Sequence, residues 1–312
     1  MNIRIPIYIL ILLIIVFQGC APVPDFFREA SKKYTSGDYA GSVFEYDKEI
    51  QNHKDNDSAY LMRGKAENLL GRFNDAVNDF TKSLELNKGF SAYFNRGIAY
   101  LSMNENTKAE SDFTEAIKLK LISDTAYYCR GYVRNLLNKH EEALDDYNIA
   151  ILLNPGYANA YVNRGNIKSE LEDYQGAVED YTISIDINPN DISAYFNRGY
   201  TFKLLGEYER AISDLDYIIG IDSLNKEAYN LRGDSYLNLK NYSKAIIDFS
   251  KIIELSPHDA KAFFNRGLAY IKLKKKKQGC ADLTKSSELG YVEANAELTK
   301  NCKKPILIKK KK

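Results

Sequence analysis

The stretch AYFNRG at residues 92–97 recurs letter for letter at 194–199, and the variant AFFNRG stands at 262–267. The first two copies begin 102 residues apart and the last two 68 residues apart, and both distances are multiples of 34. A fixed period between 20 and 50 residues is the signature of a repeat protein, in which each repeat is one supersecondary unit. The chain is therefore expected to consist of stacked repeats.

Four kinds of residue recur at fixed places around this stretch. An aromatic residue stands four positions before each repeated glycine, a small residue twelve positions after it, and a bulky apolar residue sixteen positions after it. Such offsets place residues on one face of a helix, so each repeat is predicted to hold two amphipathic helices that approach closely at their smallest residues. The glycines are Gly64, Gly97, Gly131, Gly165, Gly199, Gly233 and Gly267.

An arginine directly precedes each of these glycines, and an aspartate stands sixteen residues after each arginine. One matched partner for every arginine predicts an ion pair between the two helices of each repeat. The alternative is a row of arginines that binds anionic ligands. The degenerate first repeat has Glu29 and Glu45 at these two places, so we expect it to lack the pair.

The pattern resembles the tetratricopeptide repeat (TPR), a helix-turn-helix unit of 34 residues. The resemblance implies an all-α fold, an α-solenoid in which about eight units stack into a right-handed superhelix. The predicted repeats cover residues 23–290, and a capping helix at 291–302 and a basic tail at 303–312 follow them. The approximate repeat bounds are 23–56, 57–89, 90–123, 124–157, 158–191, 192–225, 226–259 and 260–290.

The N-terminal residues differ in kind from the repeats. After Arg4 comes an apolar run from Ile5 to Phe17. Its helix would span about 20 Å, which is less than the roughly 30 Å of a bilayer's hydrocarbon core, so the run is typical of a secretory signal peptide.

Gly19 and Cys20 follow this run and resemble the lipobox of bacterial lipoproteins, in which the cysteine is lipidated and becomes the first mature residue. The two residues before Gly19 depart from those usual in that motif. The resemblance implies a signal peptide at 1–19, lipid attachment at Cys20, a tether at 20–25, and an exported, membrane-anchored lipoprotein that faces the periplasm or the cell surface. The alternative is an ordinary signal peptide followed by an incidental cysteine.

The absence of catalytic motifs favours a binding protein over an enzyme. With 43 basic against 42 acidic side chains, the chain carries a formal charge of +1, which does not indicate a nucleic-acid partner. No GxSxG, phosphate-binding glycine loop or HExxH motif is present, so no catalytic residue, cofactor or metal site is expected. The expected function is a non-catalytic protein–protein interaction scaffold of the bacterial cell envelope. The alternatives are an envelope hydrolase that uses groove carboxylates and a purely structural spacer.

The TPR resemblance also implies a concave groove, lined by the first helices, that binds a peptide or protein segment. Asparagine side chains there could hydrogen-bond a peptide backbone, and aromatic side chains could hold its apolar residues. In the alternative interpretation, the asparagines only satisfy neighbouring helices. Lysines that clamp a carboxylate in some relatives are absent from the corresponding positions. The candidate groove residues are Phe94, Asn95, Tyr128, Tyr132, Asn163, Phe196, Asn197, Tyr200, Phe264 and Asn265.

Three cysteines remain after Cys20. Cys280 and Cys302 could be joined in an exported protein and would then attach the last helix to the last repeat. Cys129 is interpreted as a small packing residue, because no histidine stands in a suitable relation to it. Two lysine runs, one near residue 275 and one at the C-terminal end, are interpreted as solvated surface, with contact to anionic lipid or an acidic surface as the alternative. The identity of the partner and the oligomeric state are left open.

Overall fold

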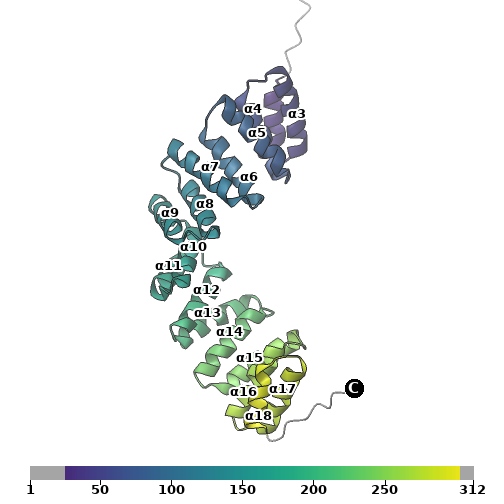
Figure 1. The fold of residues 1–312 in the computed structure, drawn as a ribbon, viewed down its shortest axis with the longest axis vertical. Coiled ribbons are helices and arrows are strands. Elements are labelled where there is room, and N and C mark those ends of the chain that lie inside the picture. The colour runs from purple at the N-terminus through teal and green to yellow at the C-terminus, as the bar shows by residue number, and fades with distance from the viewer. Residues whose placement is uncertain (1–24, 303–312) are drawn as a thin grey trace, which may run out of the picture. The chain divides into compact units, whose positions relative to one another are not determined.

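The computed structural model describes residues 25–302, which divide into two compact units, 25–137 and 138–302 (Figure 1). The predicted signal peptide at 1–19, the lipid attachment at Cys20 and the basic tail at 303–312 lie outside the described residues. Of the predicted tether, only Asp25 is described, and its side chain accepts a hydrogen bond from the Arg28 N–H at 2.8 Å at the start of the first helix.

The described residues form seventeen α-helices and contain no strand. The first unit contains α2 (Phe26–Thr35), α3 (Tyr39–Asn52), α4 (Asp57–Leu69), α5 (Phe73–Leu86), α6 (Phe90–Ser102), α7 (Asn106–Leu119) and α8 (Asp124–Leu136). The second unit contains α9 (His140–Leu153), α10 (Ala158–Glu170), α11 (Tyr174–Ile187), α12 (Ile192–Leu204), α13 (Tyr208–Ile221), α14 (Lys226–Asn238), α15 (Tyr242–Leu255), α16 (Ala260–Lys272), α17 (Lys276–Glu288) and α18 (Glu293–Asn301).

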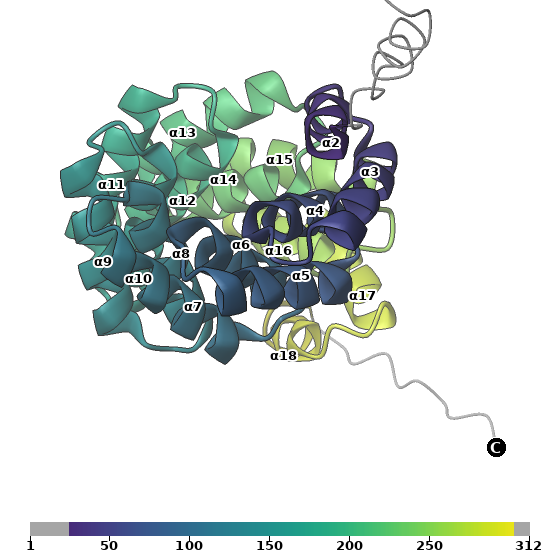
Figure 2. The same ribbon diagram turned by 90° about the horizontal axis from the view of Figure 1, so that it is seen from above.

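Within each unit, the helices pack in consecutive pairs. The pairs α4/α5 and α6/α7 in the first unit, and α12/α13, α14/α15 and α16/α17 in the second, are each joined by a short turn (Figure 2). The second helix of a pair also packs on the first helix of the next pair, and neighbouring first helices such as α12 and α14 contact each other. The predicted all-α solenoid of helix-turn-helix repeats is confirmed.

The turn inside each pair is set by one residue with a left-handed backbone. After α14, Lys240 has φ 59°, and the N–H groups of Lys240 and Asn241 donate back to the carbonyls of Leu237 and Tyr236 at 3.0 and 2.8 Å. This Schellman arrangement satisfies the last carbonyls of the helix and reverses the chain. The corresponding residues in the other pairs are Gly37, Gly71, Asn104, Asn138, Glu172, Gly206 and Lys274.

The repeated glycines lie where the two helices of a pair approach most closely. A Cβ atom on Gly97 would lie 2.8 Å from the Phe113 ring of the second helix, which is closer than real Cβ contacts. Leucines replace the aromatic ring opposite Gly199 and Gly267. A Cβ on Gly267 would still lie 3.0 Å from Leu283, whereas the nearest atom to a Cβ on Gly199 would be Cβ of Asp214 at 3.4 Å, so Gly199 is the exception. The glycine therefore makes room for the aromatic residue in most repeats.

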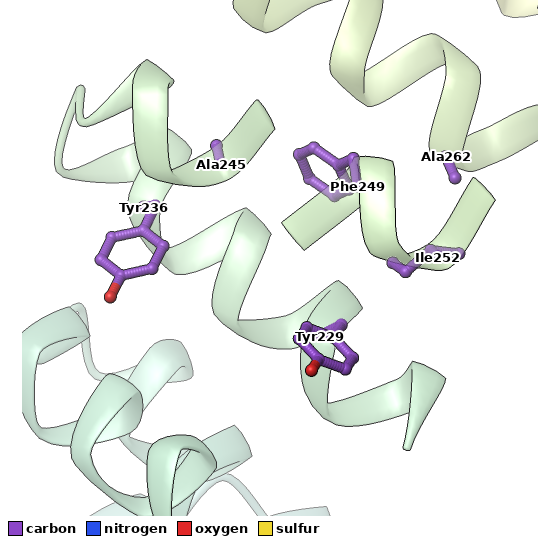
Figure 3. Packing of buried hydrophobic residues seen from close by; sticks show 6 residues of the cluster. All are labelled: Tyr229, Tyr236, Ala245, Phe249, Ile252 and Ala262. Carbon is purple, nitrogen blue, oxygen red and sulfur yellow. The ribbon is translucent and has the colours of Figure 1, made fainter. Parts of the chain in front are cut away.

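The core forms a row of clusters along the chain, of which one is shown in Figure 3. Phe249 is fully buried and Ile252, one turn further along α15, is 2% exposed. They pack with Tyr229 and Tyr236 of α14 and with Ala262 of the following helix α16. The apolar face of a second helix is thus shared between its own repeat and the next, which is why a single repeat does not bury its core alone.

The predicted Arg–Asp pairs are confirmed in six repeats. Arg198 donates to Asp214 through Nε at 2.9 Å and through Nη2 at 2.7 Å, so the pair is bidentate. The arginine side chain is 16% exposed and the aspartate side chain 6% exposed. The other five bidentate pairs are Arg63–Asp79, Arg96–Asp112, Arg164–Asp180, Arg232–Asp248 and Arg266–Asp282.

The same arginines also link neighbouring repeats, which the sequence did not predict. Nη1 of Arg198 donates to Thr182 at 3.2 Å, on the second helix of the preceding repeat. The guanidinium carbon lies 5.5 Å from the ring centre of Tyr195 on its own helix, so the cation also faces an aromatic ring. Each such arginine therefore holds together three helices.

The first repeat lacks the Arg–Asp pair, as expected, but a different ion pair takes its place. Although it lacks the arginine, Lys33 of α2 donates to Glu45 of α3 at 2.9 Å, and Lys48 donates to the other carboxylate oxygen at 2.9 Å. An interhelical ion pair is therefore present, because a lysine four residues after Glu29 supplies the cation.

At the C-terminal end, α18 packs on α17. Cys280 of α17 and Cys302, which directly follows α18, form a disulfide with their Cα atoms 5.8 Å apart. Between the two helices, the Tyr291 ring lies 4.9 Å from the ring of Phe264 on α16. No helix within residues 25–302 has both the length and the apolar character needed to cross a bilayer.

Candidate functional site

The candidate residues all lie on the first helices of the repeats, at three places relative to the repeated glycine. Phe94 and Asn95 precede Gly97 by three and two positions, and Tyr132 directly follows Gly131. Because one turn of helix separates these places, their side chains lie on one side of each first helix. We call this side the first-helix face.

The aromatic candidates divide into packed and exposed side chains. Phe94 lies 5.6 Å from Phe113, ring centre to ring centre, and belongs largely to the core of the first unit. Phe264 is covered by Tyr291, and Tyr128 is half-buried. Tyr132 and Tyr200 are 38% and 45% exposed. The two tyrosines offer more surface to a ligand than the phenylalanines do.

The candidate asparagines Asn95, Asn197 and Asn265 donate hydrogen bonds within the protein. Nδ2 of Asn197 donates to Oδ1 of Asn166 on the preceding first helix at 3.0 Å, and Nδ2 of Asn265 donates to Asp234 at 3.3 Å in the same way. Nδ2 of Asn95 donates to the Ser91 carbonyl on its own helix at 2.7 Å. The bonds of Asn197 and Asn265 join neighbouring first helices, and the bond of Asn95 stays within its own helix. The fourth, Asn163 on α10, is half-buried.

A pocket of about 540 Å³ opens on the first-helix face of the second unit, and we call it the first-helix pocket. It brings together two predicted residues, Phe196 and Tyr200 of α12, and it excludes Asn163, Asn197, Phe264 and Asn265 from its lining. The candidates in the first unit belong to a separate body. The remaining lining residues are Lys203, Lys226, Glu227, Asn230, Leu231, Asp234, Ile252, Asp259 and Lys261.

The charges in this pocket are partly neutralised by one another. Asp234 accepts from Lys203 Nζ at 3.1 Å and from Asn265, so both of its carboxylate oxygens are used. Lys226 donates to the Ser256 hydroxyl at 3.0 Å. Lys261 is exposed and makes no ion pair within the described residues. The pocket therefore combines an apolar wall with a polar rim, an arrangement suited to binding.

Chemically reactive groups are sparse in the described part of the chain. No group of three or more His, Cys, Asp or Glu side chains there could hold a metal ion. Burial raises the pKa of the Cys129 thiol to about 12, and the side chain packs beside Phe94 and Phe113, as expected of a packing residue. Lys65, directly after Gly64 on α4, is half-buried, and this burial lowers the pKa of its ammonium group.

Lys65, Asn166 and Asp234 also belong to the first-helix face and were not predicted. All three directly follow a repeated glycine, the same place as Tyr132 and Tyr200. This position recurs in every repeat, but the type of residue at it differs from one repeat to the next. A search by position in the repeat would have found them, whereas a search for recurring asparagine and aromatic residues did not.

Comparisons with known families agree with this architecture. Models described as "Tetratricopeptide repeat" match residues 57–90, 90–121, 192–223, 227–259 and 260–289, and one described as "TPR repeat" matches residues 165–206. Human tetratricopeptide repeat protein 13 is 31% identical over 78 residues, which are 25% of this chain and 9% of that protein. Chicken DnaJ homolog subfamily C member 3 is 27% identical over 116 residues, which are 36% of this chain and 23% of that protein. The chain thus matches less than a quarter of the length of either relative.

Solved structures share the fold. The C-terminal part of a TPR repeat-containing protein from Cytophaga hutchinsonii superposes with a TM-score of 0.66 at 15% identity, over 77% of this chain and 98% of that one. YrrB, described as a TPR protein with an unusual peptide-binding site, superposes with a TM-score of 0.56 at 22% identity, over 60% of this chain and 97% of that one. With its repeated sequence, helix pairs and family matches, the chain belongs to the tetratricopeptide repeat family.

Proposed function

We propose that this protein is a non-catalytic scaffold that binds a segment of a partner protein on its first-helix face, with the first-helix pocket as the main contact. TPR proteins are typically non-enzymatic interaction modules, and that general role is supported by the family and the fold. The single observation that carries the finer proposal is the open pocket of about 540 Å³ between α12, α14 and α16.

The lining of the pocket indicates the kind of segment that it would bind. Phe196 and the exposed Tyr200, with the buried Leu231 behind Phe196, form an apolar wall that suits a bulky apolar side chain. Asn230 lines the same pocket and can both donate to and accept from a peptide backbone. An extended segment with at least one large apolar residue is therefore the proposed ligand. YrrB has a peptide-binding site on a fold of the same kind.

A selection from a library of random peptides, displayed on phage and panned against the full chain, tests this proposal. Peptides that bind should lose at least about tenfold in affinity to the double variant Tyr200→Ala/Asn230→Ala, because both contacts are removed. Ile247→Ala is the matched control, since it removes a 65% exposed apolar side chain from a second helix of the same unit. Affinity that is unchanged in the double variant would contradict the proposal.

The same experiment separates the two alternatives. A structural spacer would enrich no peptide that is sensitive to Tyr200 and Asn230. An envelope hydrolase would cleave the selected peptides, and Asp234→Asn or Glu227→Gln would abolish the cleavage while binding persists. Asp234 is held by Lys203 and Asn265, an arrangement that suits a structural carboxylate better than a catalytic one.

The location in the cell envelope is part of the proposal and rests on the sequence up to Cys20. The apolar run before Gly19 and Cys20 favours export and lipidation, and a disulfide between Cys280 and Cys302 suits an oxidising compartment. In bacteria fed an alkyne-labelled fatty acid, the chain should become labelled and fractionate with membranes. Cys20→Ala should lose the label, whereas Cys129→Ala should keep it. Label that persists in Cys20→Ala would refute lipidation at this residue.

A further inference from the structure

A second pocket, of about 510 Å³, opens between α13, α14 and α15 of the second unit, and we call it the second-helix pocket. Its lining includes Gly220 and Ile247, the carboxylate of Asp216 and the ammonium group of Lys244. It shares no lining residue with the first-helix pocket, so the proposed binding of a partner segment does not explain these side chains.

Ile247 supplies exposed apolar surface that the repeat does not need. It is 65% exposed and stands directly before Asp248, the aspartate that pairs with the repeated arginine. In the other repeats that carry this pair, the residue at the same position is polar or small: Asn78, Ser111, Asp145, Glu179, Ser213 and Ala281. Because those repeats fold in the same way without an apolar side chain here, the stability of the repeat does not account for Ile247.

Gly220 leaves an open space in the same pocket. It lies in the last turn of α13 without a left-handed backbone, and a Cβ atom added to it would meet no atom within 4 Å. Other repeats have larger side chains at this position: Glu85, Lys118, Leu152, Asp186, Glu254 and Glu288. Glycine is less favourable than alanine within a helix, and neither the backbone conformation nor the packing of α13 requires it here.

The charged groups of the pocket offer both a cation and an anion to a partner. Lys244 is exposed and makes no ion pair within residues 25–302, and its Nζ lies 5.2 Å from the ring centre of Tyr236. The side chain of Asp216 is 53% exposed, and one of its oxygens accepts a hydrogen bond from Arg232 Nη1 at 2.5 Å. Two basic and two acidic side chains line the pocket, so it does not favour a strongly charged partner.

These features complement one another across a twofold axis. In a symmetric dimer with an isologous interface, every contact occurs twice, so one surface must carry both members of each contact. The second-helix pocket carries an exposed apolar side chain and an open space, and an ammonium group and an exposed carboxylate. We propose that the second-helix pockets of two copies of this chain pack together, with Ile247 of each copy at Gly220 of the other and Lys244 of each copy beside Asp216 of the other.

The size of the pocket indicates a weak, reversible dimer. Small interfaces belong to transient complexes, and exposed ion pairs add little free energy of association, so the dissociation constant is expected in the micromolar range. The charges mainly fix the orientation of the two copies, because like charges placed opposite each other oppose association. Ile247→Ala should weaken this dimer and leave the affinity of the first-helix pocket for a peptide unchanged, so the two proposals are tested separately.

Sedimentation of a fluorescently labelled full chain, titrated with the unlabelled full chain from about 1 to about 200 µM, tests the pairing. The sedimentation coefficient of the labelled copy should rise with concentration towards that of a dimer. The apolar run at 5–17 can itself associate, so every variant carries it and is compared with the wild-type chain. The control Lys272→Glu reverses an exposed charge outside the pocket and should associate like the wild-type chain.

An exchange of charges identifies the twofold contact. Lys244→Glu titrated with itself, and Asp216→Lys titrated with itself, should each associate at least about tenfold more weakly, because like charges then face each other twice. Labelled Lys244→Glu titrated with Asp216→Lys should associate to within about threefold of the wild-type chain, since both contacts then join opposite charges. Failure of this mixture to recover association, with both variants folded, would overturn the proposal. Equal losses in Lys244→Glu and Lys272→Glu would overturn it too, because net charge alone would then explain them.

Gly220→Leu tests the open space without weakening the fold. Leucine favours a helix more than glycine does, so the midpoint of thermal unfolding should be equal to that of the wild-type chain or higher. Association should fall at least about tenfold, because the added side chain fills the space that receives Ile247. This variant decides the question even if Asp216→Lys, which loses the bond from Arg232, does not fold. Undiminished association of Gly220→Leu would overturn the proposal, as would a wild-type chain that stays monomeric throughout the titration, in which case the pocket serves a different protein.

Discussion

Arg198 holds Asp214 through two parallel hydrogen bonds and, with its remaining nitrogen, reaches Thr182 on the preceding repeat. The aspartate is almost completely buried, so its charge depends on the arginine for solvation. The side chain that joins the two helices of one repeat therefore also joins that repeat to its neighbour. In a stacked array, contacts between neighbours determine how far unfolding spreads.

Removing this arginine alone should destabilise the second unit strongly. Arg198→Met leaves the buried Asp214 carboxylate unpaired and should cost about 3 kcal/mol or more in the free energy of unfolding, whereas Arg198→Met/Asp214→Leu should cost less than the single change. Urea unfolding followed by circular dichroism measures both. Lys118→Met, which breaks an exposed pair with Glu115, is the control and should cost less than about 1 kcal/mol. Equal losses in the free energy of unfolding for Arg198→Met and Lys118→Met would show that the buried pair stabilises the fold no more than an exposed pair does.

The glycines of two repeats should respond oppositely to the same substitution. Gly97→Ala places a methyl group 2.8 Å from the Phe113 ring and should destabilise by about 1–3 kcal/mol through overpacking. Gly199→Ala meets its nearest atom at 3.4 Å, so the helix-favouring alanine should be neutral or stabilise by about 0.4–1 kcal/mol. Thermal unfolding of the two variants gives the comparison. A destabilised Gly199→Ala would mean that the glycine is required for a reason other than space.

The contacts that the sequence predicted are those in which the same two residue types recur. The Arg–Asp pairs were found because both partners are constant at a spacing of sixteen in all seven repeats. Each arginine also donates a hydrogen bond to a residue fifteen or sixteen positions earlier, on the preceding repeat. The acceptor there is a hydroxyl in some repeats and an amide or a carboxylate in others. The acceptors are Asp47, Thr81, Thr114, Asn148, Thr182, Asp216 and Ser250. Because no single residue type recurs, a search for repeated letters does not find it.

The candidate site was less predictable for a related reason. Whether an asparagine on the first-helix face is used within the fold depends on the neighbouring helix. Asn197 and Asn265 donate hydrogen bonds to Asn166 and Asp234, each 31 residues earlier on the preceding first helix. Asn95 instead donates to a carbonyl of its own helix. The first-helix pocket lies where the side chains of neighbouring first helices leave a space between them. Its position depends on individual residues that the repeat does not specify.

The turn after α14 should be improved by glycine. Lys240 has φ 59°, a left-handed conformation that costs a non-glycine residue about 1–2 kcal/mol, and it makes no ion pair within the described residues. Lys240→Gly should therefore raise the free energy of unfolding by up to about 1 kcal/mol, or the midpoint temperature by about 2–4 °C. Gly206→Ala is the mirror control, because Gly206 holds the corresponding place at φ 80°. The Gly206→Ala variant should be less stable than the wild-type chain. A more stable variant would contradict the conclusion that the left-handed backbone at this position favours glycine.

The first repeat should lose stability in acid through Glu45. Hydrogen bonds from Lys33 and Lys48 lower the pKa of this carboxyl below its ordinary value of 4.5. Since the folded-state pKa is lower than the unfolded one, the stabilisation is complete above about pH 4.5 and is lost as the pH falls through the folded-state pKa. Hydrogen exchange of the α2 and α3 amides at several pH values would show this loss. Glu45→Gln should remove this part of the pH dependence, and an unchanged profile would assign it to other carboxylates.

The disulfide should stabilise the C-terminal end alone. Cys280 and Cys302 are 22 residues apart, and closing a loop of that length is worth about 3 kcal/mol in the chain-entropy model. Because repeats contact only their neighbours, Cys280→Ser/Cys302→Ser should speed hydrogen exchange in α18 and α17 and leave α12 and α13 unchanged. Cys129→Ser in the first unit is the control for removing a thiol. The Tyr291 ring over Phe264 should also loosen, since α18 no longer holds the segment against α16. Exchange that remains slow in α18 of the double variant would show that packing on α17 suffices without the bond.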